Sequence, residues 1–362
     1  MSSINLVWLI NLILPNKSNR KLYIRRTFKW AHKRRDIMKA YAIVFTIFLL
    51  FIVGCAREDR TGADQTPFAG GVEGLSMEFV RGAPPDAIFD NGGFPFSITV
   101  LIENLGEHTV KTGEGYFEVT GINPRDFDKG SQADLREDIP TEIDGVVKNF
   151  QGTVLLGDKI DMGFDDLNYI PQLPGNFLPT IRANLCYNYE TRATAELCVK
   201  RDLLTNIDTK EICSVSGEKI VYNSGAPIQI TAVEQNPAGS DKIQVLFTIS
   251  HVGFQDDRFF KIDTECDDVQ TNRDKDLVWF EVISDLSGAR ADCSGLREAL
   301  ADGSGGFIEL TNGADQQIVC SFDVTGVDSV YETPVQIRLA YRYYQFIEKP
   351  ILIKDVSVSD EE

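Results

Sequence analysis

The stretch FSITVLIENLG, residues 96–106, decides the fold that we expect. Its first, third, fifth and seventh side chains are apolar, those between are mostly polar, and the run ends at a glycine. Alternation with a period of two that stops at a glycine turn is typical of a half-buried β-strand. A related stretch, IQVLFTISHVG, occupies residues 243–253 and repeats the pattern at an offset of 147. The sequence therefore predicts a β-protein with an internal duplication.

A second pair of matching segments supports this duplication. Residues 186–189 read CYNY and residues 340–343 read AYRY, at an offset of 154. If the first copy folds as a hairpin centred on Arg192, one register places apolar residues on one face and polar residues on the other. In that register Cys186 lies opposite Cys198, and the second copy separates its residues in the same way. We therefore predict two related hairpins.

Short strands separated by glycine and proline predict the all-β class. We expect two tandem immunoglobulin-like β-sandwich domains. The further strands we expect span residues 76–80, 116–120, 150–156, 228–233, 278–283 and 321–324. The predicted organisation is a basic leader with a signal peptide or membrane segment (1–54), a flexible tether (55–74), the first sandwich (75–205), a linker (206–224) and the second sandwich (225–362).

The strand that ends in Asn104-Leu105-Gly106 resembles the alternating strand and Asn-x-Gly turn of CARDB-type and related prokaryotic immunoglobulin-like domains. In the second copy, His251 replaces the asparagine. The resemblance covers about a dozen residues in each copy. It implies seven-stranded sandwiches of cell-surface proteins, often arranged in tandem, that serve as spacers or adhesion modules.

Cys55 indicates where the protein works. It follows Ile52-Val53-Gly54, an apolar run over residues 40–54 and the basic start Met38-Lys39. This resembles the prokaryotic lipoprotein signal, in which the cysteine is diacylated and becomes the first residue. The run would extend ~22 Å as a helix against ~30 Å of hydrocarbon, so an uncleaved anchor is the weaker alternative. A free secreted form is the third.

All three alternatives place the bulk of the chain outside the cytoplasm, at the cell surface or in the periplasm. Residues 1–37 are either a translated basic leader or an over-long start assignment, because Met38 begins a complete signal peptide by itself. Residues 1–54 carry ten basic residues and one acidic residue, a net +9, so the total of −18 leaves −27 for residues 55–362. This acidity argues against nucleic acid and anionic lipid as partners, because the acidic surface repels phosphates.

Six cysteines follow Cys55, and an even number in an exported chain implies disulfides. The hairpin register predicts the first bridge across its strands. A hairpin-like stretch over residues 306–320 predicts the second, and the third is the remaining pair. The predicted bridges are Cys186–Cys198, Cys293–Cys320 and Cys213–Cys266.

Catalytic and metal-binding motifs are missing from the sequence. It contains no Gly-x-Ser-x-Gly, His-Glu-x-x-His, phosphate-binding loop or dinucleotide fingerprint. His108 and His251 are expected as solvated turn residues. The acidic run from Asp263 to Asp276 lacks the glycine and closing glutamate of an EF-hand, so we expect a solvated loop. We predict no enzymatic activity, no cofactor and no metal.

Tyr344 and Phe346 are expected at an exposed hairpin tip, where they would bind a partner or ligand. The predicted function is that of a lipid-anchored, non-enzymatic envelope protein with a structural, adhesive or accessory role. One alternative is a glycan- or ligand-binding surface lipoprotein with its site between the two sandwiches. Another is a hydrolase with dispersed catalytic residues.

Overall fold

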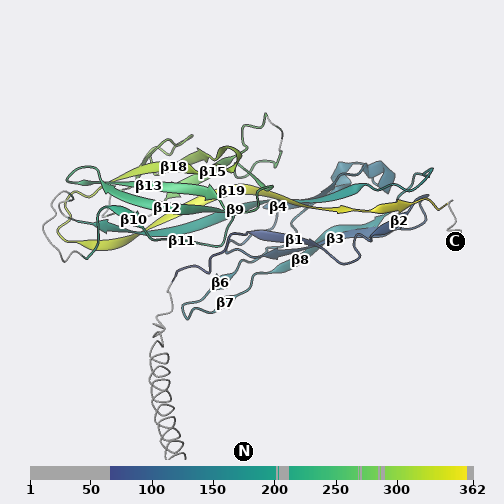
Figure 1. Ribbon diagram of the computed structural model, residues 1–362, viewed down its shortest axis with the longest axis horizontal. Helices are drawn as coiled ribbons and strands as arrows, with labels where there is room; N and C mark the ends of the chain where they lie inside the picture. The colour runs from purple at the N-terminus through teal and green to yellow at the C-terminus, as the bar shows by residue number, and fades with distance from the viewer. Residues whose placement is uncertain are drawn as a thin grey trace, which may run out of the picture. The chain divides into compact units, whose positions relative to one another are not determined.

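The structure, a computed structural model, describes residues 66–200, 203, 212–267, 269, 271–283, 286 and 290–356 (Figure 1). This part of the chain is built almost entirely of β-strands, which confirms the predicted all-β class. Residues 64–362 form one compact unit. Within the described ranges, no helix combines the length and the apolar character needed to cross a bilayer.

The strands of the described residues are β1 (Leu75–Phe79), β2 (Ala87–Phe89), β3 (Phe96–Asn104), β4 (Gly115–Thr120), β5 (Arg136–Asp138), β6 (Val147–Lys148), β7 (Val154–Leu155), β8 (Lys159–Leu167), β9 (Thr180–Val199), β10 (Gly217–Lys219), β11 (Val221–Asn223), β12 (Ile228–Pro237), β13 (Lys242–His251), β14 (Arg258–Phe260), β15 (Leu277–Val282), β16 (Asp292–Ser294), β17 (Gly305–Glu309), β18 (Gln316–Asp323), β19 (Tyr331–Pro350) and β20 (Leu352–Lys354). The short 3-10 helices are η1 (Pro124–Phe127), η2 (Gln132–Leu135) and η3 (Thr311–Gly313).

Two long strands, β9 and β19, pair antiparallel along their entire length and form the central ribbon of the molecule (Figure 1). The hairpin predicted around Arg192 does not exist, because β9 continues straight through that residue, which pairs with Arg338. Residues 190–195 contain no glycine, proline, asparagine or aspartate, so the backbone has no residue that favours a turn there. The predicted hairpin was therefore wrong.

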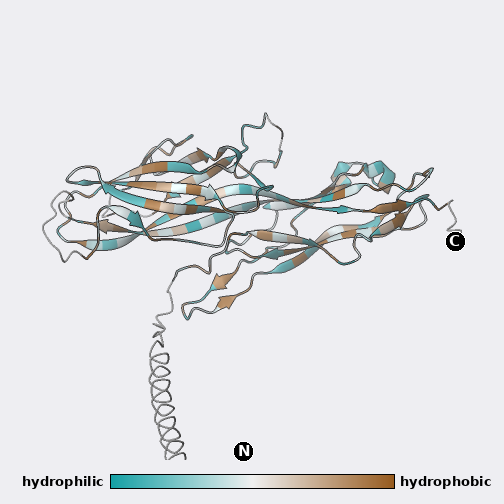
Figure 2. Ribbon diagram, in the orientation of Figure 1, coloured by the Kyte–Doolittle hydropathy of each residue, from teal (hydrophilic) through white to brown (hydrophobic). Residues whose placement is uncertain are grey.

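Each end of the ribbon is faced by a smaller sheet. The sheet β1-β3-β8 packs on the ribbon end where β4 pairs with β9, and we call this the first half. The sheet β10-β12-β13-β18-β16 packs on the end that pairs with β11 and β15, the second half. Apolar and polar residues alternate along β12, β13 and β18 (Figure 2). The two alternating motifs of the sequence are β3 and β13, each between two neighbours of its small sheet.

The two halves share their central sheet. The predicted boundary between residues 205 and 206 lies between β9 and β10, but β9 and β19 both run from one half into the other. One hydrophobic cluster extends through both, from Ile98 and Phe117 in the first half to Phe247 and Phe280 in the second. The division into two separate immunoglobulin-like domains stays a prediction.

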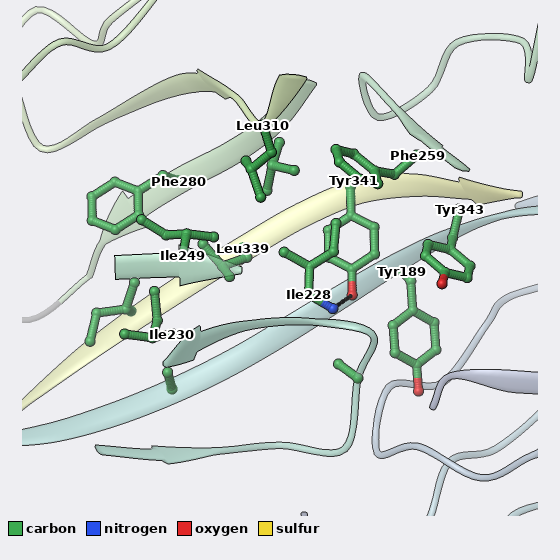
Figure 3. Packing of buried hydrophobic residues seen from close by; sticks show 14 of the residues in the cluster. Tyr189, Ile228, Ile230, Ile249, Phe259, Phe280, Leu310, Leu339, Tyr341 and Tyr343 are labelled. Atoms are coloured by element: carbon green, nitrogen blue, oxygen red, sulfur yellow. Dashed lines mark hydrogen bonds between the residues drawn. The ribbon is translucent and has the colours of Figure 1, made fainter. Parts of the chain in front are cut away.

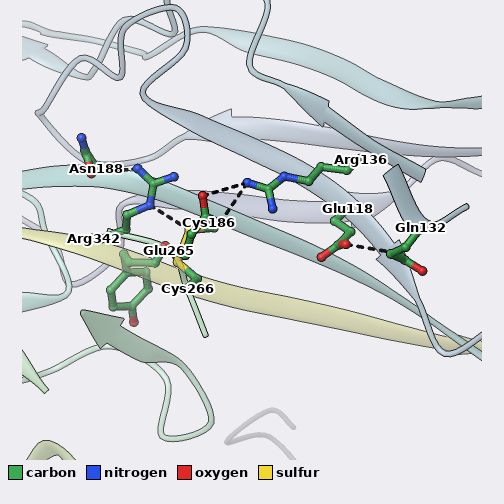
Figure 4. Close-up of polar contacts among 9 residues, drawn as sticks. Glu118, Gln132, Arg136, Cys186, Asn188, Glu265, Cys266 and Arg342 are labelled. Carbon is green, nitrogen blue, oxygen red and sulfur yellow. Dashed lines mark hydrogen bonds and ion pairs between the residues drawn. A yellow bond between two sulfur atoms is a disulfide. The ribbon is translucent and has the colours of Figure 1, made fainter. Parts of the chain in front are cut away.

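The disulfides correct two of the three predicted pairs. Among the described cysteines, Cys186 bonds to Cys266 (Figure 4), Cys198 bonds to Cys213, and Cys293 bonds to Cys320. The last is the pair expected from the sequence, with the two residues directly opposed on β16 and β18. The pair Cys186–Cys198 is impossible in this fold, since twelve residues of extended strand separate the two by ~40 Å. The pair Cys213–Cys266 is excluded because each of those residues bonds to a cysteine of β9.

Part of the predicted flexible tether is bound to the folded unit. Residues 55–65 lie outside the described residues. Lys148 donates from Nζ to the carbonyl oxygens of Thr66 (2.9 Å) and Phe68 (3.2 Å). The backbone N–H groups of Ala69 and Gly70 donate to the Glu107 carboxylate, each at 3.0 Å. Residues 66–70, which the prediction assigned to a flexible tether, are therefore hydrogen-bonded to the folded unit.

Candidate functional site

Two equivalent corners hold the ribbon against the small sheets. In the first half, the Tyr189 hydroxyl donates to Asn104 Oδ1 at 3.3 Å, and a Cβ on Gly106 would lie 2.0 Å from that hydroxyl. In the second half, the Tyr343 hydroxyl lies 2.9 Å from His251 Nε2, and a Cβ on Gly253 would lie 2.5 Å from it. The glycine of each strand-end motif thus leaves room for a buried tyrosine hydroxyl.

A second layer of contacts repeats in the same way. The Leu75 N–H donates to the Tyr187 hydroxyl (3.1 Å), and its carbonyl accepts from Gln345 Nε2 (2.8 Å). In the other half, the Ile228 N–H donates to the Tyr341 hydroxyl (3.4 Å; Figure 3), and its carbonyl accepts from the Thr191 hydroxyl (2.6 Å).

The equivalent residues of the ribbon are 154 apart, and exchanging them maps the ribbon onto itself. The pair Tyr187–Tyr343 becomes Tyr341–Tyr189, which is also a pair in the observed register. The two halves are therefore related by a local pseudo-twofold axis at the centre of the ribbon. This relation allows each position of one half to be compared with its counterpart in the other.

In the second half, strand β11 fills the edge of the ribbon. β11 pairs antiparallel with β9, with Tyr222 opposite Thr194 and Asn223 opposite Ala193. The Asn223 side-chain amide also accepts from the Ile230 N–H and donates to the Ile230 carbonyl, both at 2.9 Å. β11 thus satisfies the edge of β9 and the edge of β12 together.

The counterpart of Ile230 in the first half is Met77, two residues after Leu75 as Ile230 is two after Ile228. The Gly74 carbonyl accepts from the Leu105 N–H, and the Val80 N–H donates to the Thr99 carbonyl of β3. The backbone groups of these even-numbered residues therefore point towards β3. Because backbone direction alternates along an antiparallel strand, the N–H and C=O groups of Met77 point away from β3. β1 is also the end strand of its sheet among the described residues.

The edge of β19 opposite β9 is open at the same place. Even-numbered residues of β19 direct their backbone groups to this edge, as the bond from the Ile283 N–H to the Gln336 carbonyl shows. β14 and β15 cover the edge up to Tyr344. Phe346 and Glu348 correspond to the β9 positions covered by β11. On the edge of β19 that faces away from β9, no strand of the described chain pairs with these two residues.

A groove of about 450 Å³ lies between the two open edges. Leu75 and Met77 of β1 line one side, and Gln345, Phe346 and Ile347 of β19 line the other. The loop between β13 and β14 closes one end and contributes Phe254, whose side chain is 66% exposed. The groove thus combines an apolar lining with unpaired strand edges.

The groove is negatively charged. Of the described residues that line it, Glu73, Asp256 and Asp257 carry acidic groups and none is lysine, arginine or histidine. Burial raises the pKa of Asp257 to about 6, although the Tyr343 hydroxyl donates to its Oδ2 at 2.8 Å. A cationic side chain placed here would find carboxylates without a basic residue of the lining to compete for them.

The predicted partner-binding aromatic residues do not lie at a hairpin tip. β19 is continuous to Pro350, so Tyr344 and Phe346 are within a strand and half-buried. The Tyr344 hydroxyl donates to Asn184 Oδ1 at 2.7 Å, and the Arg182 guanidinium lies 4.1 Å from the centre of the Phe346 ring. The predicted placement was wrong, but Phe346 does line the groove. Cys55 lies outside the described residues.

The acidic run and the histidines have structural contacts. Asp263 accepts from Asn188 Nδ2 at 2.7 Å, and Glu265 forms an ion pair with Arg136 at 2.9 Å (Figure 4). His108 and His251 are partly buried against tyrosine rings rather than solvated. Within the described ranges, no group of three or more histidine, cysteine, aspartate or glutamate side chains is placed to hold a metal ion.

The triad of His251, Tyr343 and Asp257 is the arrangement most like a catalytic one. Burial raises the pKa of the Tyr343 hydroxyl far above its ordinary value, so this oxygen is a weak nucleophile near neutral pH. Burial also lowers the pKa of His251, which keeps the imidazole neutral. The geometry fits a satisfied hydrogen-bond network better than nucleophilic catalysis.

Comparison with known proteins adds no family. No protein-family model matches the sequence. No curated protein matches it. Among solved structures, the secreted serine protease VesC from Vibrio cholerae is 10% identical over 77% of this chain and 51% of that protein, with a TM-score of 0.17. The chain thus spans about half the length of that protein, and a similarity this low carries no argument about fold or activity.

Proposed function

We propose that the chain is a lipid-anchored cell-envelope protein that acts as a non-enzymatic accessory module, and that its first half binds an extended segment of a partner protein. The observation that supports this is the open strand position beside β19. The pseudo-twofold axis relates this position to the one that β11 fills in the second half. The occupant would be a strand, added to the edge of the ribbon.

The contacts of the added strand follow from β11. Its backbone would pair with Phe346 and Glu348, as β11 pairs with the corresponding residues of β9. An asparagine at the position of Asn223 would bond to both backbone groups of Met77. A basic residue after this asparagine would approach Asp256 and Glu73. The expected partner segment is therefore extended and carries an asparagine followed by a lysine or arginine.

A titration with synthetic peptides tests this proposal. The probe is GEKIVYNSGA, the chain's own residues 217–226, labelled with fluorescein and followed by fluorescence polarisation. A second peptide, GEKIVYNKGA, has lysine at the position of Ser224 and is expected to bind more tightly at low salt. GEKIVYLSGA removes the asparagine amide and is expected to bind at least tenfold more weakly. Equal binding of all three, or of none, would count against strand addition.

A matched pair of protein variants separates backbone pairing from side-chain effects. Glu348→Ala and Glu348→Pro both remove the ion pair with Arg182, but only proline removes the N–H that points to the open edge. We expect the alanine variant to bind the probe and the proline variant to lose binding. If no peptide binds while a glycan array gives a ligand whose binding requires Phe254, the groove would be a carbohydrate site instead.

The anchor is tested separately with Cys55→Ser in the full chain. The variant is expected to leave the membrane fraction, because the acyl chains would have no attachment site. A variant that stays with the membrane as firmly as the wild type would contradict the lipid anchor. Crosslinking and pull-down from native envelope would identify the partner protein, whichever result the anchor variant gives.

A further inference from the structure

The β6–β7 hairpin exposes apolar side chains to an unusual degree. Phe150 at its turn is 94% exposed and Leu156 is 79% exposed. Val147, Val154 and Leu155 on the two arms are also exposed, and Figure 2 shows both arms as hydrophobic. The sequence pattern predicts a strand over residues 150–156, whereas only Val154 and Leu155 are in one. Most of this apolar surface is not buried in the described part of the fold.

Hydrogen bonds of Asn149 hold the turn of the hairpin. The Asn149 N–H donates to the Thr153 carbonyl at 2.9 Å. The Asn149 side-chain oxygen accepts from the N–H groups of Gln151 and Thr153, both at 2.9 Å. These bonds fix the loop that presents Phe150 to solvent. The exposure therefore belongs to a defined surface.

The hairpin also differs in charge from the rest of the protein. No aspartate or glutamate occurs between Asp144 and Asp158, in a region of sequence that is otherwise strongly acidic. Lys148 is the single charged residue between them, and its ammonium group is bound by the carbonyl oxygens of Thr66 and Phe68. A surface of this kind favours a hydrocarbon environment, and its contact would depend little on salt.

The hairpin lies against the segment that follows Cys55, the proposed site of the membrane anchor. Lys148 contacts Thr66, which follows Cys55 by eleven residues. A fully extended chain of this length reaches at most ~40 Å. We propose that the β6–β7 hairpin inserts Phe150 and its apolar neighbours into the membrane surface. This inference rests on the proposed anchor at Cys55, which would keep the hairpin close to the bilayer. Two attachments of moderate strength together give stable binding.

Insertion would be shallow. About five residues separate Phe150 from the base of the hairpin, so the tip reaches ~15 Å from the folded unit. Interfacial segments bury their apolar side chains roughly 5–10 Å into the boundary between headgroups and acyl chains. The hairpin would thus fix the orientation of the protein on the membrane, in addition to the tether.

Vesicle binding of unlipidated protein tests this proposal independently of the anchor. Residues 56–362 contain the whole compact unit and lack Cys55. We expect them to co-sediment with phosphatidylcholine vesicles, and Phe150→Asp to reduce the partition coefficient at least tenfold. Phe254→Asp is the matched control, because this aromatic is also exposed but lines the groove. It should bind vesicles as the wild type does.

Depth is measured with Phe150→Trp in a Trp279→Phe background, which leaves one tryptophan in residues 56–362. Brominated lipids are expected to quench its fluorescence and shift its emission to the blue. The proposal is overturned if wild-type protein ignores vesicles, if Phe150→Asp binds as well as wild type, or if the tryptophan is not quenched. Crosslinking of position 150 to an envelope protein in place of lipid would also overturn it.

Discussion

Replacing Asp257 by asparagine should change how stability depends on pH. The Asp257 side chain is 9% exposed and burial raises its pKa to about 6, compared with 3.8 for the ordinary group. Because the folded state holds this proton more tightly than the unfolded state, the group contributes stability below about pH 4. That contribution is lost as pH rises towards 6. The shift of about 2.2 pKa units corresponds to roughly 3 kcal/mol at 1.36 kcal/mol per unit.

Asparagine remains neutral and keeps an oxygen that accepts from the Tyr343 hydroxyl. The free energy of unfolding of Asp257→Asn should therefore rise relative to the wild type by about 2 kcal/mol between pH 4 and pH 7, because part of the full ~3 kcal/mol is already lost at pH 4. Urea unfolding at pH 4, 5, 6 and 7 measures this difference. Asp256→Asn, which removes a charge one residue away, is the control. A difference between wild type and Asp257→Asn that stays constant with pH would show that folding does not raise the pKa of Asp257.

Further predictions concern the corner and the ribbon. Gly106→Ala should reduce the free energy of unfolding, measured in urea, by about 3 kcal/mol or more, because its Cβ would overlap the buried Tyr189 hydroxyl. Gly93→Ala is the control and should be close to neutral, because open space surrounds Gly93. Replacing Cys198 and Cys213 by alanine together opens a cross-link between residues 15 apart and should cost about 3 kcal/mol in calorimetry or urea unfolding. A loss below 1 kcal/mol would mean that other contacts already close this loop.

The all-β class follows from the sequence, because periodicity reports which face of a strand is buried. The side-chain pattern could not distinguish a hairpin at Arg192 from a continuous strand, because both structures place the same residues on the apolar face. One local signal favoured the strand, because residues 190–195 lack turn-forming residues. Pro334 obscured the matching strand, and the structure tolerates it because even-numbered residues of β19 point their backbone groups away from β9.

The candidate site was only partly predictable. The sequence shows the strand-end glycines and the tyrosines as separate repeats, but not that Gly106 meets Tyr189 and Gly253 meets Tyr343. Their meeting depends on how the small sheets pack on the ribbon, which is a long-range property. The open edge beside Phe346 was invisible for the same reason, since an edge is defined by the strand that is missing.

Residue-resolved amide exchange by NMR shows whether the open edge of β19 accepts a strand. Addition of the probe GEKIVYNSGA should slow exchange at the Phe346 and Glu348 amides, which point to the open edge. Exchange at Gln345 and Ile347 should not change, because these amides point to β9 and are already bonded in the ribbon. Binding of the probe without protection at Phe346 and Glu348 would contradict strand addition at this edge.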